Sequence, residues 1–390
     1  MEEELTGKQI DLPPEVMHEI LSRLPVKPLC RFKLVSKPWL SLISNPKFIA
    51  MHSEAIENNK DVFSQRRRLV FTDGENHCLY SLDLDQFLDH NHAVLKNRKP
   101  NEDVDGPVAV ATELDFVYNL FPLGRRRWFP FIHSCNSLLL SESFYGYHLI
   151  NPVAKELKKL PKTPTWRVKP GFGDLYGFGY DYSTKEYKVV IGQFFYGHGT
   201  VFSVYTLETD SWRRIKGLPC IPTPDLSRDG IVVNGGVHWL LRRVADESML
   251  MILSFTLAED KFRIIPLPSS IGSTGSIKLG VFRDWLCITF SSASTEVKTY
   301  NEFWVMKEYG VRESWTRMRV SIPYHTLSHS GFWRGSYDLM VFDRSSLVMY
   351  NFNDEEFWTL PIKDIGKVGR FGSVGIYVES LASVITQDRV

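Results

Sequence analysis

Few residues in this sequence have the type and spacing that catalysis or ligand binding requires. The glycine-rich stretch Gly171–Gly179 would need a following helix to hold a phosphate, and a strand-like segment follows it instead. His90 and His92 form a close pair in a polar stretch without a third metal ligand nearby. His238 alternates with apolar residues, which indicates a half-buried, hydrogen-bonded histidine in a strand. Since GxSxG, HExxH and Walker A motifs are absent, we expect no catalytic residue, no metal and no cofactor.

Charge and cysteine content restrict the class of protein. The chain has 46 Lys and Arg against 45 Asp and Glu, so no overall field attracts nucleic acid or a membrane. The triplets Arg66–Arg68 and Arg125–Arg127 are not extended by basic neighbours, and we interpret both as solvated loops. The five cysteines are far apart, which favours reduced thiols. Without an apolar run of membrane length or a signal peptide, the sequence predicts a water-soluble protein of the cytoplasm or nucleus.

The segment Asp11–Phe48 has a different character from the rest of the chain, because apolar residues recur in it at helical spacing. It predicts three short helices, after which Ser44–Phe48 starts a last short turn. Caps and prolines mark the expected helix starts: Asp11 with Pro13 and Pro14, Pro25 with Pro28, and Ser36 with Pro38. A module of this size cannot bury all its large apolar side chains. Some of them must therefore contact either the rest of the chain or another protein.

This segment closely resembles the F-box family, over residues 8–52. The family landmarks stand in order: Leu12-Pro13, Ile20-Leu21, Leu24-Pro25, Leu29, Phe32, Val35-Ser36 and Trp39. The resemblance implies that the module binds a Skp-family adaptor and, through it, the cullin of a ubiquitin ligase. Carried over position by position, it implies adaptor contacts at Leu12, Pro13, Ile20, Leu21, Leu24, Pro25, Leu29 and Trp39.

From Leu69 onward the sequence repeats. A strand, a turn, an aromatic or aliphatic residue and often a closing Leu-Pro occur five times, with steps of 55, 50, 53 and 42 residues. The residues that follow the turn are Leu157, Trp212, Phe262, Trp315 and Phe357. A second element, a tight turn before an apolar strand, recurs in phase around Asn136, Gly235, Asp284 and Gly335. Its first interval is doubled, so we expect the missing copy at Ser183–Lys185.

A repeat of roughly 40 to 50 residues with several strands is typical of a β-propeller blade. We therefore expect a mainly β protein, with a propeller of about six blades over residues 69–390 and an all-α module of three short helices before it. Seven blades are the alternative count. The early strands "RLVFTDG" and "HCLYSLDL" should share a blade with the C-terminal "FGSVGIYVESLAS". A β-sandwich with a second β domain is the rival fold, and it would not give an even period.

The repeating body resembles the F-box-associated, kelch-like propeller domains of plant F-box proteins. The landmarks include "CNSLLL", "LINPVAKELKKLP", "YGFGYDYSTKEYKVV", "VNGGVHWL" and "YVESL". The resemblance implies a non-catalytic receptor that recruits a target protein for ubiquitylation and degradation. Expected target contacts are Arg125, Arg126, Arg127, Trp128, Trp166, Phe195 and Tyr196, with plain exposure as the alternative for each. A carbohydrate- or small-ligand-binding propeller that uses the F-box only as a tether is the second hypothesis, and an enzyme on a propeller scaffold is the third.

Overall fold

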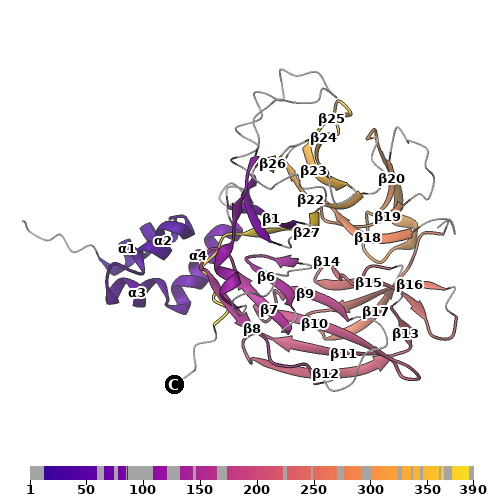
Figure 1. The fold of residues 1–390 in the computed structure, drawn as a ribbon, viewed down its shortest axis with the longest axis horizontal. Helices are drawn as coiled ribbons and strands as arrows, with labels where there is room; N and C mark the ends of the chain where they lie inside the picture. Colours follow the sequence, from indigo (N-terminus) through magenta and orange to yellow (C-terminus); the bar gives the residue numbers. More distant parts are fainter. Residues whose placement is uncertain are drawn as a thin grey trace, which may run out of the picture.

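The fold joins a small group of helices to a ring of β-sheets (Figure 1). The structure is a computed structural model, and it describes residues 13–58, 66–73, 78–84, 86, 109–120, 132–143, 146–164, 174–222, 226–246, 249–269, 276–291, 301–322, 327–334, 337–342, 346–359, 362–363 and 371–385. Among these residues, no helix is long and apolar enough to cross a membrane.

The helical module contains four helices, one more than the sequence predicted. They are α1 (Pro14–Ser22), α2 (Val26–Phe32), α3 (Lys37–Ile43) and α4 (Pro46–Asn58). The expected last turn continues as α4 because Pro46 suits a first helical position and no proline or glycine interrupts the next twelve residues. Ser36 caps α3 as predicted, since its hydroxyl accepts a hydrogen bond from the Trp39 backbone N–H at 3.4 Å. The proposed cap Asp11 lies outside the described residues.

The described strands form six blades, as the repeat predicted. Blade 1 contains β27 (Phe371–Val378), β1 (Arg67–Asp73), β2 (Leu79–Asp83) and β4 (Thr112–Glu113). Blade 2 contains β5 (Ile132–Cys135), β6 (Leu138–Ser143), β7 (Gly146–Asn151) and β8 (Glu156–Lys159). Blade 3 contains β9 (Leu175–Asp181), β10 (Glu186–Phe195), β11 (Gly199–Thr206) and β12 (Ser211–Leu218).

The remaining blades follow the same plan. Blade 4 contains β13 (Cys220–Ile221), β14 (Ile231–Val233), β15 (Gly236–Arg243), β16 (Leu250–Thr256) and β17 (Lys261–Ile265), with β13 and β14 both paired to β15. Blade 5 contains β18 (Ser276–Phe282), β19 (Trp285–Ser291), β20 (Asn301–Met306) and β21 (Trp315–Val320). Blade 6 contains β22 (Leu327–Arg334), β23 (Tyr337–Phe342), β24 (Ser346–Asn351) and β25 (Glu356–Thr359). Outside the blades are the parallel pair β3 (Ala109–Val110) with β26 (Ile362–Lys363), and the 3₁₀ turns η1 (Asp115–Leu120) and η2 (Arg312–Ser314).

The two ends of the described propeller close the ring, as the sequence predicted. Strand β27 pairs antiparallel with β1, so that Leu69 lies opposite Ile376 and Phe71 opposite Val374. The inner strands then contact one another around the ring in the order β27, β5, β9, β14, β18, β22 and back to β27. Because every inner strand has a neighbour on both sides, the ring has no free blade edge at its centre.

The turns of both repeated elements are β-hairpin turns, and each of those named below contains a residue with positive φ. In the second element, φ is 48° at Asn136, 49° at Asn234 and 53° at Arg283. The missing copy is the turn between β9 and β10, where Lys185 has a φ of 58°. The first element shows the same geometry at Lys155, Asp210, Asp260 and Glu355. The turns before the second and fourth strands of a blade therefore set the period.

The Leu-Pro that closes many repeats joins one blade to the next. The indole N–H of Trp212, in blade 3, donates to the carbonyl of Pro161 at the end of blade 2 (2.7 Å). The indole of Trp315, in blade 5, donates in the same way to Pro266 after blade 4 (2.8 Å). In these two repeats the tryptophan thus satisfies a proline carbonyl of the preceding blade, that of the Leu160-Pro161 pair in one case and that of Pro266, just before Leu267-Pro268, in the other.

The propeller has two faces with different connections. The turns between first and second strands, and between third and fourth strands, lie on one face, which we call the proximal face because the helical module packs there. The connections between second and third strands and between blades leave the opposite, distal face. Lys185 in the β9–β10 turn pairs with Glu54 of α4 at 3.2 Å, and Val153 in the β7–β8 turn contacts the helical core. The helices therefore cover part of the proximal face only.

Candidate functional site

The helical module has its own apolar core and an exposed apolar surface. Leu21, Val26, Leu29, Ile43 and Phe48 are buried, and Leu381 from the C-terminal segment of the propeller completes the same cluster. The module therefore buries part of its surplus apolar surface on the body of the chain, which was one of the two possibilities that the sequence left open.

The predicted adaptor contacts divide into three groups. Pro13, Ile20 and Pro25 are exposed, with 47% of Ile20 open to solvent. Leu24 and Trp39 are half-buried, whereas Leu21 and Leu29 lie in the core of the module. Leu12 lies outside the described residues. Adaptor contact at all eight positions stays a prediction, and a direct contact would be made first by the exposed residues.

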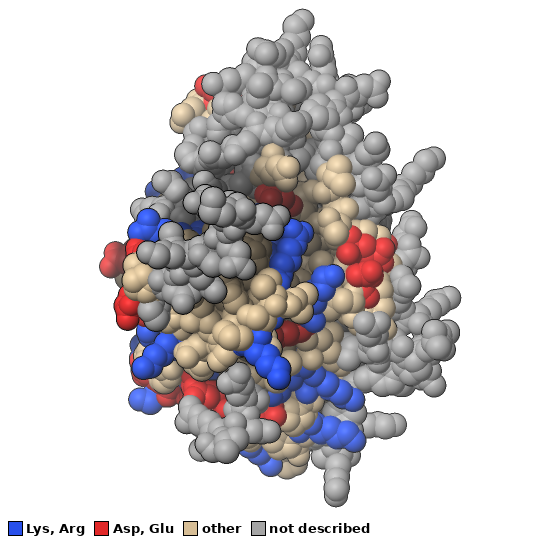
Figure 2. Space-filling model, turned by 90° about the vertical axis from the view of Figure 1, so that its left-hand side faces the viewer, with Lys and Arg blue, Asp and Glu red and all other residues tan. Residues whose placement is uncertain are grey.

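Further large apolar side chains of the module are exposed. They are Val16 on α1, Leu34 and Val35 between α2 and α3, and Leu40 on α3. Leu34 is 87% exposed. The sequence did not predict contacts at Leu34 and Leu40, because neither belongs to the apolar stripe that predicts the core of the module. Figure 2 shows this end of the molecule, where uncharged surface lies between groups of lysine and arginine side chains.

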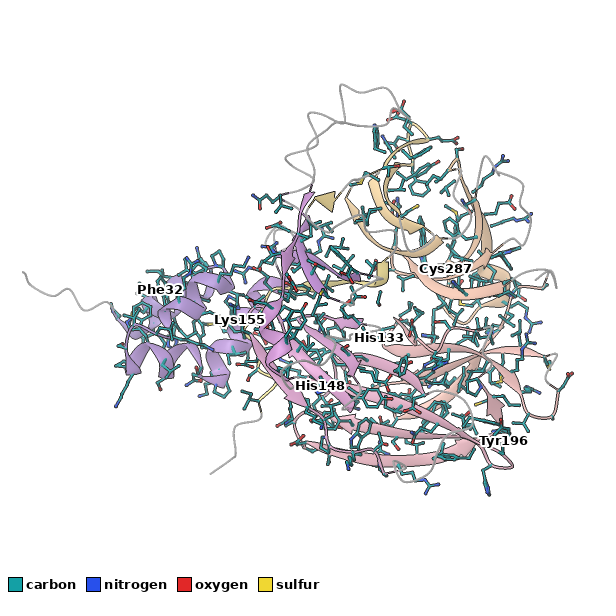
Figure 3. All side chains as sticks on the ribbon, viewed as in Figure 1. Phe32, His133, His148, Lys155, Tyr196 and Cys287 are labelled. Carbon is teal, nitrogen blue, oxygen red and sulfur yellow. The ribbon has the colours of Figure 1, made fainter. Side chains whose placement is uncertain are left out.

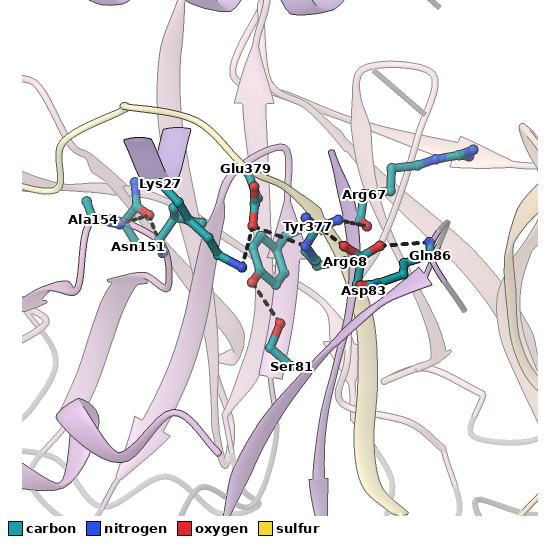
Figure 4. Close-up of polar contacts among 11 residues, drawn as sticks. Lys27, Arg67, Arg68, Ser81, Asp83, Gln86, Asn151, Ala154, Tyr377 and Glu379 are labelled. Carbon is teal, nitrogen blue, oxygen red and sulfur yellow. Dashed lines mark hydrogen bonds and ion pairs between the residues drawn. The ribbon is translucent and has the colours of Figure 1, made fainter. Parts of the chain in front are cut away.

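An ionic network lies between the module and the propeller, with Glu379 and Arg68 buried and Lys27 64% exposed at its side chain (Figure 4). Glu379, just after β27, is only 3% exposed at its side chain and receives Arg68 Nε at 3.1 Å. Lys27 of α2 lies 3.5 Å from the same carboxylate oxygen, and Arg68 also pairs with Asp83 at 2.9 Å. One carboxylate from the propeller is thus shared between a helix of the module and the first propeller strand. This contact links residues more than 300 positions apart in the chain.

The structure contradicts the interpretation of Arg66–Arg68 as a solvated loop. Arg66 and Arg68 are buried and lie in the junction, and Arg66 donates to the Leu24 carbonyl at 3.0 Å. The sequence alone could not predict this burial, because the Leu24 carbonyl that accepts from Arg66 and the Glu379 carboxylate that pairs with Arg68 come from distant segments. The second triplet, Arg125–Arg127, lies outside the described residues.

His52 of α4 is a neutral, buried part of the junction. Its Nε2 lies 3.1 Å from Arg66 Nη1 and 3.1 Å from the Leu24 carbonyl. In the neutral ring, Nε2 either accepts from the guanidinium with the proton on Nδ1 or donates its own proton to the Leu24 carbonyl, but not both at once. Burial lowers the pKa of His52 to about 4, and the charge of Arg66 lowers it further, while the bond to Leu24 opposes the shift.

This shift predicts that the protein loses stability in mild acid. Unfolded His52 has a pKa near 6.5, so between pH 6.5 and about 4 the unfolded chain binds a proton that the folded chain excludes. Stability is therefore fully present above pH 6.5 and falls as the pH drops through this window. Burial also lowers the pKa of His148 and of His238 to about 4, whereas the raised pKa of Glu142 acts in the opposite direction. His52→Gln should therefore make the fall of the urea midpoint between pH 6.5 and 4 less steep without abolishing it. An unchanged slope in this variant would contradict the assignment of a neutral His52.

The described residues of the motifs that could indicate catalysis or ligand binding have structural roles. His238 is hydrogen-bonded as predicted, to the Ile231 carbonyl at 3.0 Å and the Tyr309 hydroxyl at 2.6 Å, but it is fully buried instead of half-buried. In the glycine-rich stretch, a Cβ on Gly177 would lie 2.3 Å from a methyl group of Val237, so blade packing requires the glycine. Within the described ranges, no three His, Cys, Asp or Glu side chains are arranged to hold a metal. His90 and His92 lie outside those ranges.

The predicted target contacts belong, where they are described, to the distal face. Phe195 is half-buried, and Tyr196 in the β10–β11 turn is 71% exposed. Figure 3 shows Tyr196 at the end of the propeller far from the helices, whereas Lys155 lies beside them. Arg125, Arg126, Arg127, Trp128 and Trp166 lie outside the described residues.

Comparison with known families assigns both parts of the chain. Residues 114–384 match the F-box associated beta propeller domain, and residues 10–50 match the F-box domain. The chain belongs to the F-box proteins with an F-box-associated propeller. An F-box/kelch-repeat protein of Arabidopsis thaliana is 28% identical over 359 residues, with 89% of each chain covered. The F-box protein CPR1 of the same plant is 27% identical over 388 residues, covering 90% of this chain and 85% of that one.

The family assignment gives the two parts their names. The helical module is the F-box, and the six-bladed ring is the F-box-associated propeller, as the resemblance implied. The order of the parts, F-box first and propeller second, is that of plant F-box proteins. A substrate-recognition role in a Skp–cullin–F-box assembly follows for the family in general.

Proposed function

We propose that this chain is the substrate-recognition subunit of a Skp–cullin–F-box ubiquitin ligase. The F-box binds a Skp-family adaptor, and the propeller binds a target protein that is then ubiquitylated and degraded. The observation that carries the proposal is the set of large apolar side chains that the F-box leaves exposed, although its core is complete. A monomer has no use for such side chains gathered on one small module, so a protein partner is the best explanation.

The arrangement of the two parts supports this role. Helices α1 and α3 lie on the side of the F-box away from the propeller, so an adaptor could bind there without meeting a blade (Figure 1). The F-box covers part of the proximal face, which leaves the distal face for the target. The chain then acts without bond-making chemistry, by raising the effective concentration of target lysines near the ubiquitin-charged enzyme.

We place the F-box at residues 8–52 and the target-binding propeller at residues 69–390. The cytoplasm or nucleus is the expected compartment, because the adaptor and cullin act there.

Co-purification tests the proposal. The full chain, co-expressed with a Skp-family adaptor and a cullin, should retain both partners in a stable complex when it is captured by an affinity tag. Failure to retain the adaptor would overturn the proposal. Retention of the adaptor without the cullin would favour a propeller that uses its F-box only as a tether.

A further inference from the structure

The interface between blades 2 and 3 changes from apolar to polar at its distal end. On β6, the alternation that turns Leu138 and Leu140 toward blade 3 places Glu142 next on the same side. On β10, the alternation that turns Val189 and Ile191 toward blade 2 places Gln193 next on that side. Both strands run toward the distal face at these residues. Each of the two blades therefore places one polar side chain beyond the last apolar layer of their interface.

Residues from two further strands join this group. Asp174 immediately precedes β9 and accepts the Tyr147 hydroxyl at 2.6 Å. The Gln193 side-chain amide donates to both oxygens of Asp174, at 3.1 and 3.2 Å. We call Glu142, Tyr147, Asp174 and Gln193 the distal cluster. Its members come from four strand ends in two blades, so the fold holds them in place.

The distal cluster has hydrogen-bond acceptors to spare. Gln193 is only 5% exposed, yet among the described residues its Oε1 has no hydrogen-bond partner. This oxygen belongs to the same amide whose nitrogen is already bound to Asp174, so the unmet acceptor lies within the cluster. The half-buried carboxylate of Glu142 likewise has no hydrogen bond or ion pair within the described part of the chain. A buried acceptor without a donor, such as the Gln193 Oε1, is costly, which indicates that a donor is supplied from outside.

The charges around the cluster favour a cation as that donor. Burial raises the pKa of Glu142 to about 7, and the nearby Asp174 raises it further, while Arg228 opposes both effects. Burial also raises the pKa of Asp174. Tyr176 on β9 and Asp229 before β14 add an aromatic ring and a third carboxylate at the inner edge, beside His133 of β5. His133 lies near the middle of the propeller in Figure 3, so Tyr176 and Asp229 are on the side of the cluster that is closer to the centre of the ring.

We propose that the distal cluster binds the cationic side chain, arginine or lysine, of the protein that this chain recruits. A guanidinium or ammonium group carries donors and no acceptor, which matches two carboxylates and an unpaired amide oxygen. Tyr147 and Tyr176, whose ring centroids are 6.4 Å apart, supply aromatic surface for the aliphatic stem. Arg228 is exposed and forms no ion pair with Glu142 or Asp174 in the described structure, so it competes for the site without filling it.

The inference rests on the proposed function only in naming a target protein as the occupant. A titration of the distal cluster does not involve the F-box. Loss of adaptor capture would therefore overturn the proposed function and leave this site standing, and the reverse also holds.

Calorimetric titration of the full chain, bound to its adaptor or alone, tests the site. The probes are N-acetyl-arginine amide and its neutral analogue N-acetyl-citrulline amide. The arginine probe should bind about tenfold or more tightly than the citrulline probe, because only it carries charge-assisted donors. Glu142→Gln should weaken arginine binding by about tenfold, and Arg228→Gln should strengthen it. Binding should also tighten as the pH rises through about 7, where Glu142 loses its proton.

The matched control is Glu186→Gln, the same change at the proximal end of β10, which should leave arginine binding unaltered. Equal binding of the two probes, or no binding of either, would overturn the proposal. So would an E142Q variant that binds arginine as the parent does. Asp174→Asn provides a second variant should E142Q lose the native circular-dichroism spectrum. Spermidine that binds more tightly than an arginine-containing peptide would show that the occupant is a free polyamine and would also overturn the proposal.

Discussion

Ile20→Asp should abolish capture of the Skp-family adaptor while the propeller stays folded. Ile20 is 47% exposed on α1, so the carboxylate has solvent around it in the free chain and costs little stability. In a complex the same carboxylate would be buried without a partner in an apolar contact. That burial costs several kcal/mol, which corresponds to a loss in affinity on the order of a hundredfold or more.

Capture should be measured by affinity purification with the adaptor and by calorimetry on the purified partners. The matched control is Ile264→Asp, because Ile264 on β17 is 55% exposed and lies in blade 4, away from the F-box. I264D should capture the adaptor as the parent chain does. If the two variants lost affinity equally, or if I20D lost none, α1 would not be part of the adaptor-binding surface.

Glu379→Gln should give the largest loss of stability among single substitutions at the junction. The side chain of Glu379 is 3% exposed, and it is shared by Arg68 and Lys27. Removing the charge leaves Arg68, whose side chain is 10% exposed, with Asp83 as its one remaining carboxylate partner among the described residues. Breaking a buried pair in this way costs about 3 kcal/mol. The urea midpoint should fall accordingly. Loss of the contact with Lys27, whose side chain is 64% exposed, should add little to this fall.

The contrast is Glu302→Gln, which breaks an ion pair of Glu302 with Arg317 at 2.9 Å on the surface of blade 5. Arg317 is 63% exposed at its side chain, so this change should cost only about 0.5 kcal/mol. A double-mutant cycle of Glu379→Gln with Arg68→Gln would isolate the energy of the pair itself. Equal losses for E379Q and E302Q would mean that the junction network does not hold the F-box in place.

Adaptor capture by E379Q should be normal, because the exposed residues of α1 are untouched. Ubiquitylation of the target should nevertheless decline, since the F-box is then held by fewer contacts, those of Leu381, Arg66 and Lys185, and its position relative to the target is less well defined. Measuring adaptor capture and ubiquitylation on the same variant therefore distinguishes a displaced F-box from an F-box that no longer binds the adaptor.

The helical module shows how much local sequence can predict. Prolines and a cap fixed the starts of α2 and α3 correctly, because these effects act over one helical turn. The length of the fourth helix was underestimated. The segment Ser44–Phe48 predicts where α4 begins, but no periodic apolar stripe follows it to predict that the helix continues to Asn58. The buried positions of Leu21 and Leu29, against the exposure of Ile20, could not be separated by the motif alone, because one helix carries residues for both its core and its surface.

The propeller was predicted from its period for a related reason. The hairpin turns place Asn136 and Asn234 at positive φ, a conformation that asparagine tolerates well, so these turns are visible in the sequence. Even the closing of the ring by β27 followed from the apolar strands at both ends.

The sequence by itself therefore determined the two parts of this protein, their order and the repeating plan of the larger one, because these depend on contacts between near neighbours in the chain. Only the tertiary structure decided which charges are buried. Arg68 pairs with Glu379 because ring closure places β1 beside β27, and Gln193 binds Asp174 because β9 pairs with β10. A residue's local sequence does not record whether water or a distant side chain will surround it. For that reason the contacts of the junction and of the distal cluster could be identified only in the folded molecule.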